Sequence, residues 1–228
     1  MVMEQPVQTA DQRAIDICVC TFRRPQATET LRSLSRLTKS ADWRLRVIVA
    51  DNDDTPSARE RVESTALECG LNLLYVHAPA RNISIARNAC LDAATAPLVA
   101  FIDDDEIAMP GWLMALVAVL DASNADVVLG QVQAVYGSEC PDWMKQGDFH
   151  SIKPVFVAGE IRTGYTCNVL LRQEALAVKD LRFDPNLGRS GGEDTVYFAA
   201  VHRAKGRIAY APEAVLKEAV TPNRALFA

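Results

Sequence analysis

Short apolar runs alternate with helix-like stretches through the first half of this 228-residue chain. The apolar runs cover residues 15–20, 45–50, 73–76 and 98–102. The predicted helices between them open at Pro25 and then cover residues 56–69 and 83–94. Short, nearly continuous apolar runs are typical of strands that are buried on both faces. The alternation therefore predicts an α/β fold with an open, mostly parallel twisted sheet flanked by helices.

Polar side chains follow several of these apolar runs at the point where each predicted strand ends. Thr21 follows the first run, Asp51 the second, and residues 103–105 the fourth. In open α/β sheets, ligands bind outside the carboxyl ends of the strands. The sequence therefore predicts a ligand site built from these strand ends.

The second half of the chain is less regular. Its predicted elements are a helix at 111–122, a strand at 126–135, a loop region at 137–153, a strand at 166–172, a helix at 193–204, and short strands at 207–211 and 214–217. Neither a repeat nor a linker interrupts the pattern. We expect a flexible arm at residues 1–14 and a single domain at residues 15–228.

Composition excludes several classes of protein. The formal net charge is −5, and basic clusters of the kind that bind nucleic acid are absent from the sequence. The apolar run 113–120 is far shorter than the ~20 residues that span a bilayer. The N-terminus does not resemble a secretory leader, and the six cysteines form no CxxC pair. We expect a cytoplasmic protein with reduced cysteines, for which peripheral membrane association stays open.

Asp103, Asp104 and Asp105 directly follow the apolar run LVAFI. Adjacent carboxylates repel one another, and a divalent cation would relieve that repulsion because hard cations take oxygen ligands. Mg²⁺ and Mn²⁺ also share their coordination with substrate phosphates. The alternative is a solvated turn that caps the helix beginning near Pro110. The triplet alone does not decide between the two.

Asp51 and Arg87 each allow two interpretations. Asp51 could accept a hydrogen bond from a base or ribose, or it could form an Asx-turn, for which aspartate is well suited. Arg87 could pair with a diphosphate, since its guanidinium matches phosphate oxygens, or it could be a surface residue on a helix.

Two further segments carry candidate residues. Gly191 and Gly192 precede Glu193 and Asp194 at the start of a predicted helix. Asp194 could be a general base on a glycine-rich loop, or the N-cap of that helix. Trp143 could offer an aromatic face to a sugar, or it could be a structural tryptophan beneath a loop.

Five segments, in this order, resemble the GT-A-type glycosyltransferases of family 2. They are ICVCTFRRP, VADND, ARNISIARNACLDAA, AFIDDDE and GGED. The resemblance is greatest to bacterial exopolysaccharide enzymes of the succinoglycan type, which extend lipid-linked repeat units. It implies a GT-A fold with a nucleotide-sugar half at about 15–106 and an acceptor half at 107–228.

The resemblance also implies roles for individual residues. Those implied to bind nucleotide are Thr21, Arg23, Asp51, Arg87, Asp103 and Asp104. Asp105, together with Asp103, would ligate Mn²⁺ or Mg²⁺. Asp194 would be the catalytic base and Glu193 would help position the acceptor, while Trp143 and Glu218 are weaker acceptor candidates.

The chain departs from the family pattern at several positions. Glycines that many relatives carry between Asn82 and Ala86, and at Cys90, are absent. Some metal-dependent relatives bring a late histidine to the metal, where this chain has Glu218. Relatives often continue beyond the position of Arg224, so we expect this chain to be a piece of a longer protein.

The implied reaction is an inverting transfer of a sugar from a UDP-sugar to a saccharide or lipid-linked saccharide acceptor. A sugar-1-phosphate nucleotidyltransferase is an alternative, but TFRRP lacks the glycine-rich phosphate loop of that class. A non-catalytic nucleotide-sugar-binding protein is a second alternative. A dehydrogenase is disfavoured because no GxGxxG follows the first predicted strand.

Overall fold

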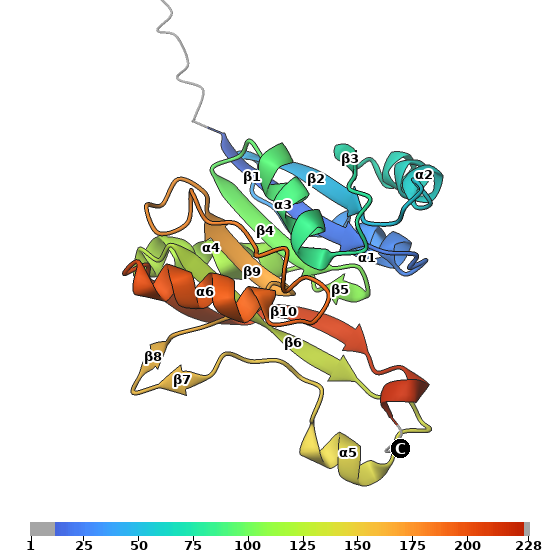
Figure 1. Ribbon diagram of the computed structural model, residues 1–228. Coiled ribbons are helices and arrows are strands. Elements are labelled where there is room, and N and C mark those ends of the chain that lie inside the picture. The colour runs from blue at the N-terminus through green and yellow to red at the C-terminus, as the bar shows by residue number, and fades with distance from the viewer. Residues whose placement is uncertain (1–11, 226–228) are drawn as a thin grey trace, which may run out of the picture.

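The computed structural model describes residues 12–225 and contains an eight-stranded sheet (Figure 1). The strands β1 (Arg13–Thr21), β2 (Trp43–Asp51), β3 (Leu73–His77) and β4 (Leu98–Asp103) form its first part. They lie in the order β3-β2-β1-β4, and every pair among them is parallel. The predicted parallel α/β architecture is therefore confirmed.

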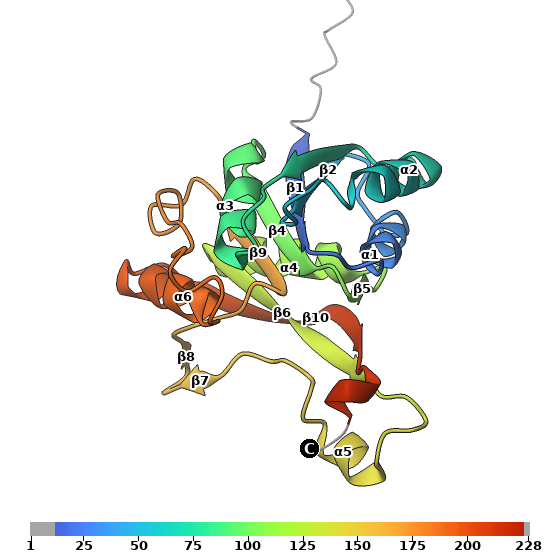
Figure 2. The ribbon, with the colours of Figure 1, turned by 45° about the vertical axis from the view of Figure 1, so that its right-hand side comes forward.

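Helices cover both faces of this parallel part. Alternate residues of β1 point to opposite faces, so Ile15, Ile17 and Val19 enter one core while Cys18 enters the other. Helices α1 (Ala27–Leu34) and α2 (Arg59–Cys69) pack on the first face, and α3 (Ile83–Ala93) packs on the second (Figure 2). Helix α2 ends at Gly70 with a left-handed φ of 64°, the conformation in which glycine commonly ends a helix.

The second half of the chain continues the same sheet. Its strands are β5 (Glu106–Ala108), β6 (Val127–Val135), β9 (Asn168–Arg172) and β10 (Ile208–Ala219). Strand β9 lies between β4 and β6 and is antiparallel to both, whereas β6 and β10 are parallel. Helix α4 (Trp112–Ser123) packs on the face of α1 and α2, and helix α6 (Glu193–Arg203) on the face of α3.

Several predictions for the second half need correction. The two short strands predicted at 207–211 and 214–217 form the single strand β10, whose register shifts between Tyr210 and Val215. Pro212 lies within this shift and has no amide hydrogen to donate to a ladder. Strand β5 is too short to give an apolar pattern. Arg13 and Ala14, which were predicted to lie in the arm, belong to β1; residues 1–11 of the predicted arm lie outside the described part.

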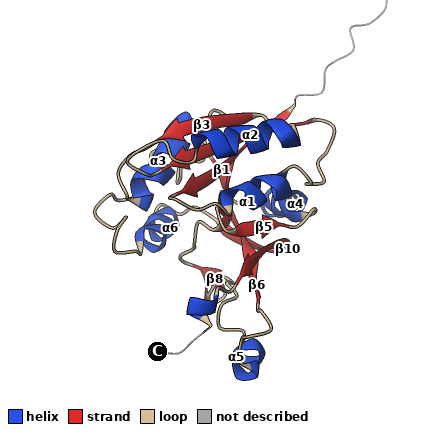
Figure 3. Ribbon diagram, turned by 90° about the vertical axis from the view of Figure 1, so that its right-hand side faces the viewer, coloured by secondary structure: helices blue, strands red, loops and turns tan. Residues whose placement is uncertain are grey.

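The predicted loop region contains regular structure. Helix α5 (Asp142–Gly147) lies within it, and the hairpin of β7 (Phe156–Val157) and β8 (Glu160–Ile161) follows. Helix α5 extends away from the main sheet (Figure 3) and packs near the short helix η1 (Pro222–Arg224), whereas the hairpin lies against β10, where Phe156 contacts Tyr210. None of the helices within residues 12–225 is long and apolar enough to cross a bilayer.

Asn168 joins the two parts of the sheet. Its side chain is fully buried and accepts a 2.8 Å hydrogen bond from Trp112 Nε1. Its amide nitrogen donates to the carbonyl oxygens of Gln131 and Ala214, at 2.8 and 2.9 Å. Every polar atom of this buried amide is therefore used to connect β9, β10, α4 and β6. Gly130 makes room for it, since a Cβ there would lie 2.4 Å from the Asn168 oxygen.

Candidate active site

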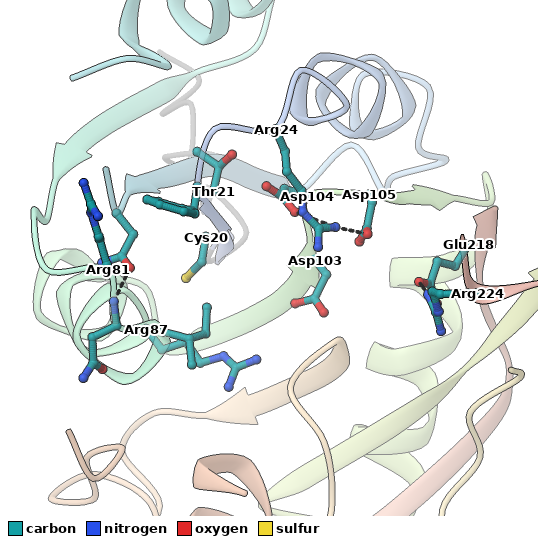
Figure 4. A pocket seen from close by; sticks show the side chains of 14 residues that line it. Cys20, Thr21, Arg24, Arg81, Arg87, Asp103, Asp104, Asp105, Glu218 and Arg224 are labelled. Atoms are coloured by element: carbon teal, nitrogen blue, oxygen red, sulfur yellow. Dashed lines mark hydrogen bonds and ion pairs between the residues drawn. The ribbon is translucent and has the colours of Figure 1, made fainter. Parts of the chain in front are cut away.

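A cavity of about 450 Å³ lies where the predicted strand ends meet (Figure 4). Thr21 pairs with Asp51, and Cys20 pairs with Asp103, in the registers of β1 with β2 and β4. The carboxyl ends of these parallel strands thus lie side by side. The residues lining the cavity are Cys20, Thr21, Phe22, Arg24, Asn52, Arg81, Asn82, Ile83, Arg87, Asp103, Asp104, Asp105, Glu218 and Arg224.

The acidic triplet forms a turn at the floor of this pocket. Asp103 ends β4, while Asp104 and Asp105 form the turn that leads into β5. The amide of Asp103 donates to Glu106 Oε2 at 2.9 Å, which fixes the turn from beneath. The N-cap of α4 is Gly111, which has no side chain with which to cap. The alternative that the triplet caps this helix is therefore wrong.

The carboxyl groups of the triplet are held in an unfavourable electrostatic environment. Burial raises the pKa of Asp104 to about 6. Burial also raises the pKa of Asp103, although Arg87 opposes the shift, and Asp105 and Glu218 add to it. Asp104 Oδ2 and Thr21 Oγ1 are buried and make no hydrogen bond of normal geometry among residues 12–225, although the neighbouring Thr21 hydroxyl lowers the pKa of Asp104 against the effect of burial. Added positive charge at this turn would satisfy these oxygens.

Glu218 faces the same turn from β10. It pairs in register with Glu106 of β5, and its side chain forms an ion pair with Arg224 of η1. Both partners of this ion pair line the pocket. The residue that stands where relatives carry a late histidine is thus close enough to contribute to the raised pKa of Asp103.

The arginine that reaches the acidic turn is Arg24 rather than Arg23. Arg23 has a left-handed φ of 55°, and its side chain is 55% exposed and paired with Asp53 at 2.8 Å, away from the pocket lining. Arg24 lines the pocket, forms an ion pair with Asp105, and lies 3.6 Å from Asp104 Oδ1. The structure therefore brings Arg24, and not the predicted Arg23, into the pocket lining.

Asp51 lies beneath the pocket and is completely buried. Its Oδ1 accepts from the Asp53 amide at 3.1 Å, and its Oδ2 accepts from the Ala58 amide and the Tyr75 hydroxyl, each at 2.8 Å. These contacts favour the turn interpretation. At the end of β2, Asn52 lines the pocket in place of Asp51.

Asp51→Ala is expected to lower the free energy of unfolding by roughly 3 kcal/mol, because it leaves two buried amides and a hydroxyl without their acceptor. Urea unfolding followed by circular dichroism measures this loss. Asp54→Ala is the matched control, since Asp54 is exposed and forms its ion pair with Arg81 at the surface. Equal free energies of unfolding for the two variants would contradict the interpretation of Asp51 as a turn residue.

Arg87 enters the pocket from α3 and is tied to α6. Both Arg87 and Glu193 are buried, and they form an ion pair. The guanidinium also lies 5.5 Å from the centre of the Phe183 ring. This buried pair excludes the interpretation of Arg87 as a surface residue. It joins the pocket to the start of the helix that carries Asp194.

Asp194 is not the N-cap of α6. That position belongs to Gly192, which has a left-handed φ of 90° and follows Gly191 at 85°. Asp194 lies in the first helical turn, where its Oδ1 accepts from the Thr195 amide at 2.7 Å. Neither Glu193 nor Asp194 is among the residues that line the pocket, so the structure brings the predicted base to the start of α6 but not into the lining itself.

Trp143 is not brought to the pocket. It lies on α5, with its ring 5.9 Å from that of Phe149 and 49% of the residue exposed. Helix α5 is separated from the carboxyl ends of β1 and β4 in both views of the ribbon (Figures 1 and 2). An acceptor role for Trp143 in the described conformation is therefore not supported.

These features define an α/β protein with a polar ligand pocket at the carboxyl ends of parallel strands. Residues 16–178 match the model of a family described as glycosyl transferase family 2. The chain is 53% identical over 214 residues to the succinoglycan biosynthesis protein ExoM of Rhizobium meliloti (strain 1021), covering 94% of this chain and 69% of ExoM. The chain therefore belongs to glycosyltransferase family 2, and the resemblance expected from the sequence is confirmed.

Other relatives are more distant. A glucosyl-dolichyl phosphate glucuronosyltransferase of Haloferax volcanii is 27% identical over 192 residues, which cover 78% of this chain and 58% of that protein. The structure of S. aureus TarS 1-349 in complex with UDP-GlcNAc has a TM-score of 0.70 and 20% identity, covering 91% of this chain and 58% of TarS 1-349. The complex of TarS 1-349 with UDP also has a TM-score of 0.70, at 22% identity, covering 92% of this chain and 61% of that chain. These likenesses confirm the GT-A fold.

Proposed function

We propose that this protein is a metal-dependent, inverting glycosyltransferase that moves a sugar from a UDP-sugar to a saccharide acceptor in bacterial exopolysaccharide biosynthesis. The observation that carries the proposal is the acidic turn in the pocket, where a buried oxygen of Asp104 has no partner among residues 12–225. The names of the relatives support the substrate classes: ExoM is a succinoglycan biosynthesis protein, and TarS has been solved with UDP-GlcNAc.

The carboxylates that line the pocket are of the chemical type that a hard divalent cation takes, although within residues 12–225 they are not gathered into a formed metal-binding cluster. Carboxylates are the protein ligands that Mn²⁺ and Mg²⁺ prefer, and these ions share their remaining positions with phosphates. Asp103 and Asp105 would hold the cation, with Asp104 and Glu218 nearby. When bound, the cation supplies positive charge that stabilises the diphosphate leaving group.

The nucleotide would be held mainly by the strand ends and by α3. Thr21 and Asn52 line the pocket at the ends of β1 and β2 and would face the base and ribose. Asp51 would contribute indirectly, because its hydrogen bonds fix the turn that carries Asn52. Arg87, held by Glu193, would place a fixed positive charge near the phosphates.

The transfer step would use Asp194 as a general base. Its carboxylate would take the proton of an acceptor hydroxyl as that oxygen bonds to the anomeric carbon. The bond from the anomeric carbon to the diphosphate oxygen would break on the opposite side, and its electrons would leave with UDP. A single displacement of this kind inverts the anomeric configuration. The acceptor would be a saccharide, carried on a lipid at the inner face of the cytoplasmic membrane.

Calorimetric titration with nucleoside diphosphates tests the donor class. We expect UDP to bind at least tenfold more tightly with Mn²⁺ or Mg²⁺ than in a chelator, because a bound cation would offset the repulsion between the pocket carboxylates and the phosphates. CDP and GDP serve as controls for the base. Equal UDP affinity with and without the cation would contradict metal dependence, and tighter binding of GDP would contradict the donor assignment.

A further inference from the structure

Every arginine that the structure places in the pocket lining is paired with a carboxylate. These pairs are Arg24 with Asp105, Arg81 with Asp54, Arg87 with Glu193, and Arg224 with Glu218. Both partners of the first and of the last pair are labelled in Figure 4. The pair of Arg24 differs from the others, because its carboxylate belongs to the acidic triplet itself. Arg24 thus places positive charge on the turn that the proposed function assigns to a metal ion.

We propose that Arg24 is an internal counter-ion that occupies the acidic turn in the ligand-free protein and that a divalent cation displaces. The displaced guanidinium then binds the phosphates of the incoming nucleotide. This inference rests on the proposed function and names a specific residue that links cation binding to nucleotide binding.

The guanidinium is an incomplete partner for the turn. It pairs with Asp105, but its Nη1 lies 3.6 Å from Asp104 Oδ1, beyond normal hydrogen-bond length. Asp104 is 6% exposed, and its Oδ2 keeps no hydrogen-bond partner within the described chain. A divalent cation carries twice the charge and coordinates several oxygens at once, so it satisfies the turn better than one guanidinium does.

The Arg24 side chain can also change position at a lower cost than the Arg87 side chain can. The Arg24 side chain is 51% exposed, whereas the side chains of Arg87 and Glu193 are each 8% exposed. Moving Arg87 would leave a buried carboxylate unpaired, which is costly. Moving Arg24 exposes it to solvent and to the pocket, where an anionic ligand provides a new partner.

If the cation displaces Arg24, this arginine has opposite effects on the affinities for the cation and for the nucleotide. It competes with the cation when the nucleotide is absent, and it attracts the diphosphate once the cation is bound. Removal of its charge should therefore strengthen binding of the cation alone and weaken binding of the nucleotide in saturating cation. A residue with a purely structural role would weaken both or change neither.

Arg24→Gln tests the inference, with Arg36→Gln as the matched control. Arg36 is an exposed arginine just after α1 that lies outside the pocket lining, so its replacement removes the same charge without touching the pocket. Mn²⁺ affinity without nucleotide is measured by electron paramagnetic resonance, and UDP affinity in saturating Mn²⁺ by calorimetry. We expect Arg24→Gln to bind Mn²⁺ roughly threefold to tenfold more tightly and UDP roughly tenfold more weakly. Arg36→Gln should change neither affinity by more than about twofold.

The outcomes separate this inference from the proposed function. Metal-dependent UDP binding in the wild type, combined with unchanged or weaker Mn²⁺ binding in Arg24→Gln, overturns only the counter-ion role. If the UDP affinity of the wild type is the same with and without Mn²⁺, the metal-dependent function and this inference are both overturned. Circular dichroism and thermal unfolding of both variants verify that each one is folded.

Discussion

Replacement of Asp194 by asparagine is expected to reduce sugar transfer by about 10²–10⁴, the usual effect of removing a general base. Asparagine keeps the size and the side-chain oxygen that accepts from the Thr195 amide, but it cannot take a proton. UDP affinity should stay near the wild-type value, because the variant leaves the acidic turn and the pair of Arg87 with Glu193 in place. Initial transfer rates at saturating donor and acceptor measure the loss.

The position of Asp194 makes this experiment easier to interpret. Since Gly192 occupies the N-cap, neither asparagine nor alanine at 194 removes a cap of α6. Asp194→Ala should cost only about 0.3–1 kcal/mol from the lost charge near the helix N-terminus. Wild-type transfer by a stable Asp194→Asn protein would rule out the base assignment.

Replacement of Asp105 by alanine is expected to abolish the dependence of UDP binding on Mn²⁺. In saturating Mn²⁺, UDP affinity should fall by roughly 100-fold, at the upper end of the losses seen when groups that support a metal site are removed. Calorimetric titrations in Mn²⁺ and in a chelator should give the same affinity for the variant.

Asp121→Ala is the control for this variant. Asp121 is an exposed aspartate that pairs with Arg13 at the surface, so its loss changes the net charge equally without touching the pocket. Retention of a large Mn²⁺ effect in Asp105→Ala would remove Asp105 from the metal site. The buried Asp103 and Asp104 would then be the ligands to test.

The sequence predicted the parallel half of the fold well because those strands are buried on both faces. A short, continuous apolar run such as LVAFI of β4 is typical of a buried parallel strand in an α/β domain. Strand β5 was missed because its three residues are too few for a pattern. The division of β10 was wrong because Pro212 marks a shift of register within a strand, which the sequence alone does not distinguish from a strand end.

The candidate site was predictable where it depends on strand ends and not where it depends on side-chain direction. The acidic turn follows from the end of β4. The choice between Arg23 and Arg24 depends on a left-handed φ at Arg23, and the choice between Asp51 and Asn52 depends on hydrogen bonds to the next turn. The pair of Arg87 with Glu193 joins positions far apart in the sequence, so no local pattern could indicate it.

The antiparallel strand β9 has a consequence for the order in which the chain can assemble. Residues 168–172 cover the edge of β4, yet they leave the ribosome after β4 and after the whole acidic turn. Until then, β4 is an uncovered strand of strongly apolar sequence, the kind of edge that pairs readily with other chains. During synthesis, the chain is therefore most prone to aggregate after β4 has emerged and before β9 has. Pairing of β9 with β4 then covers that edge and attaches the second half of the sheet to the first.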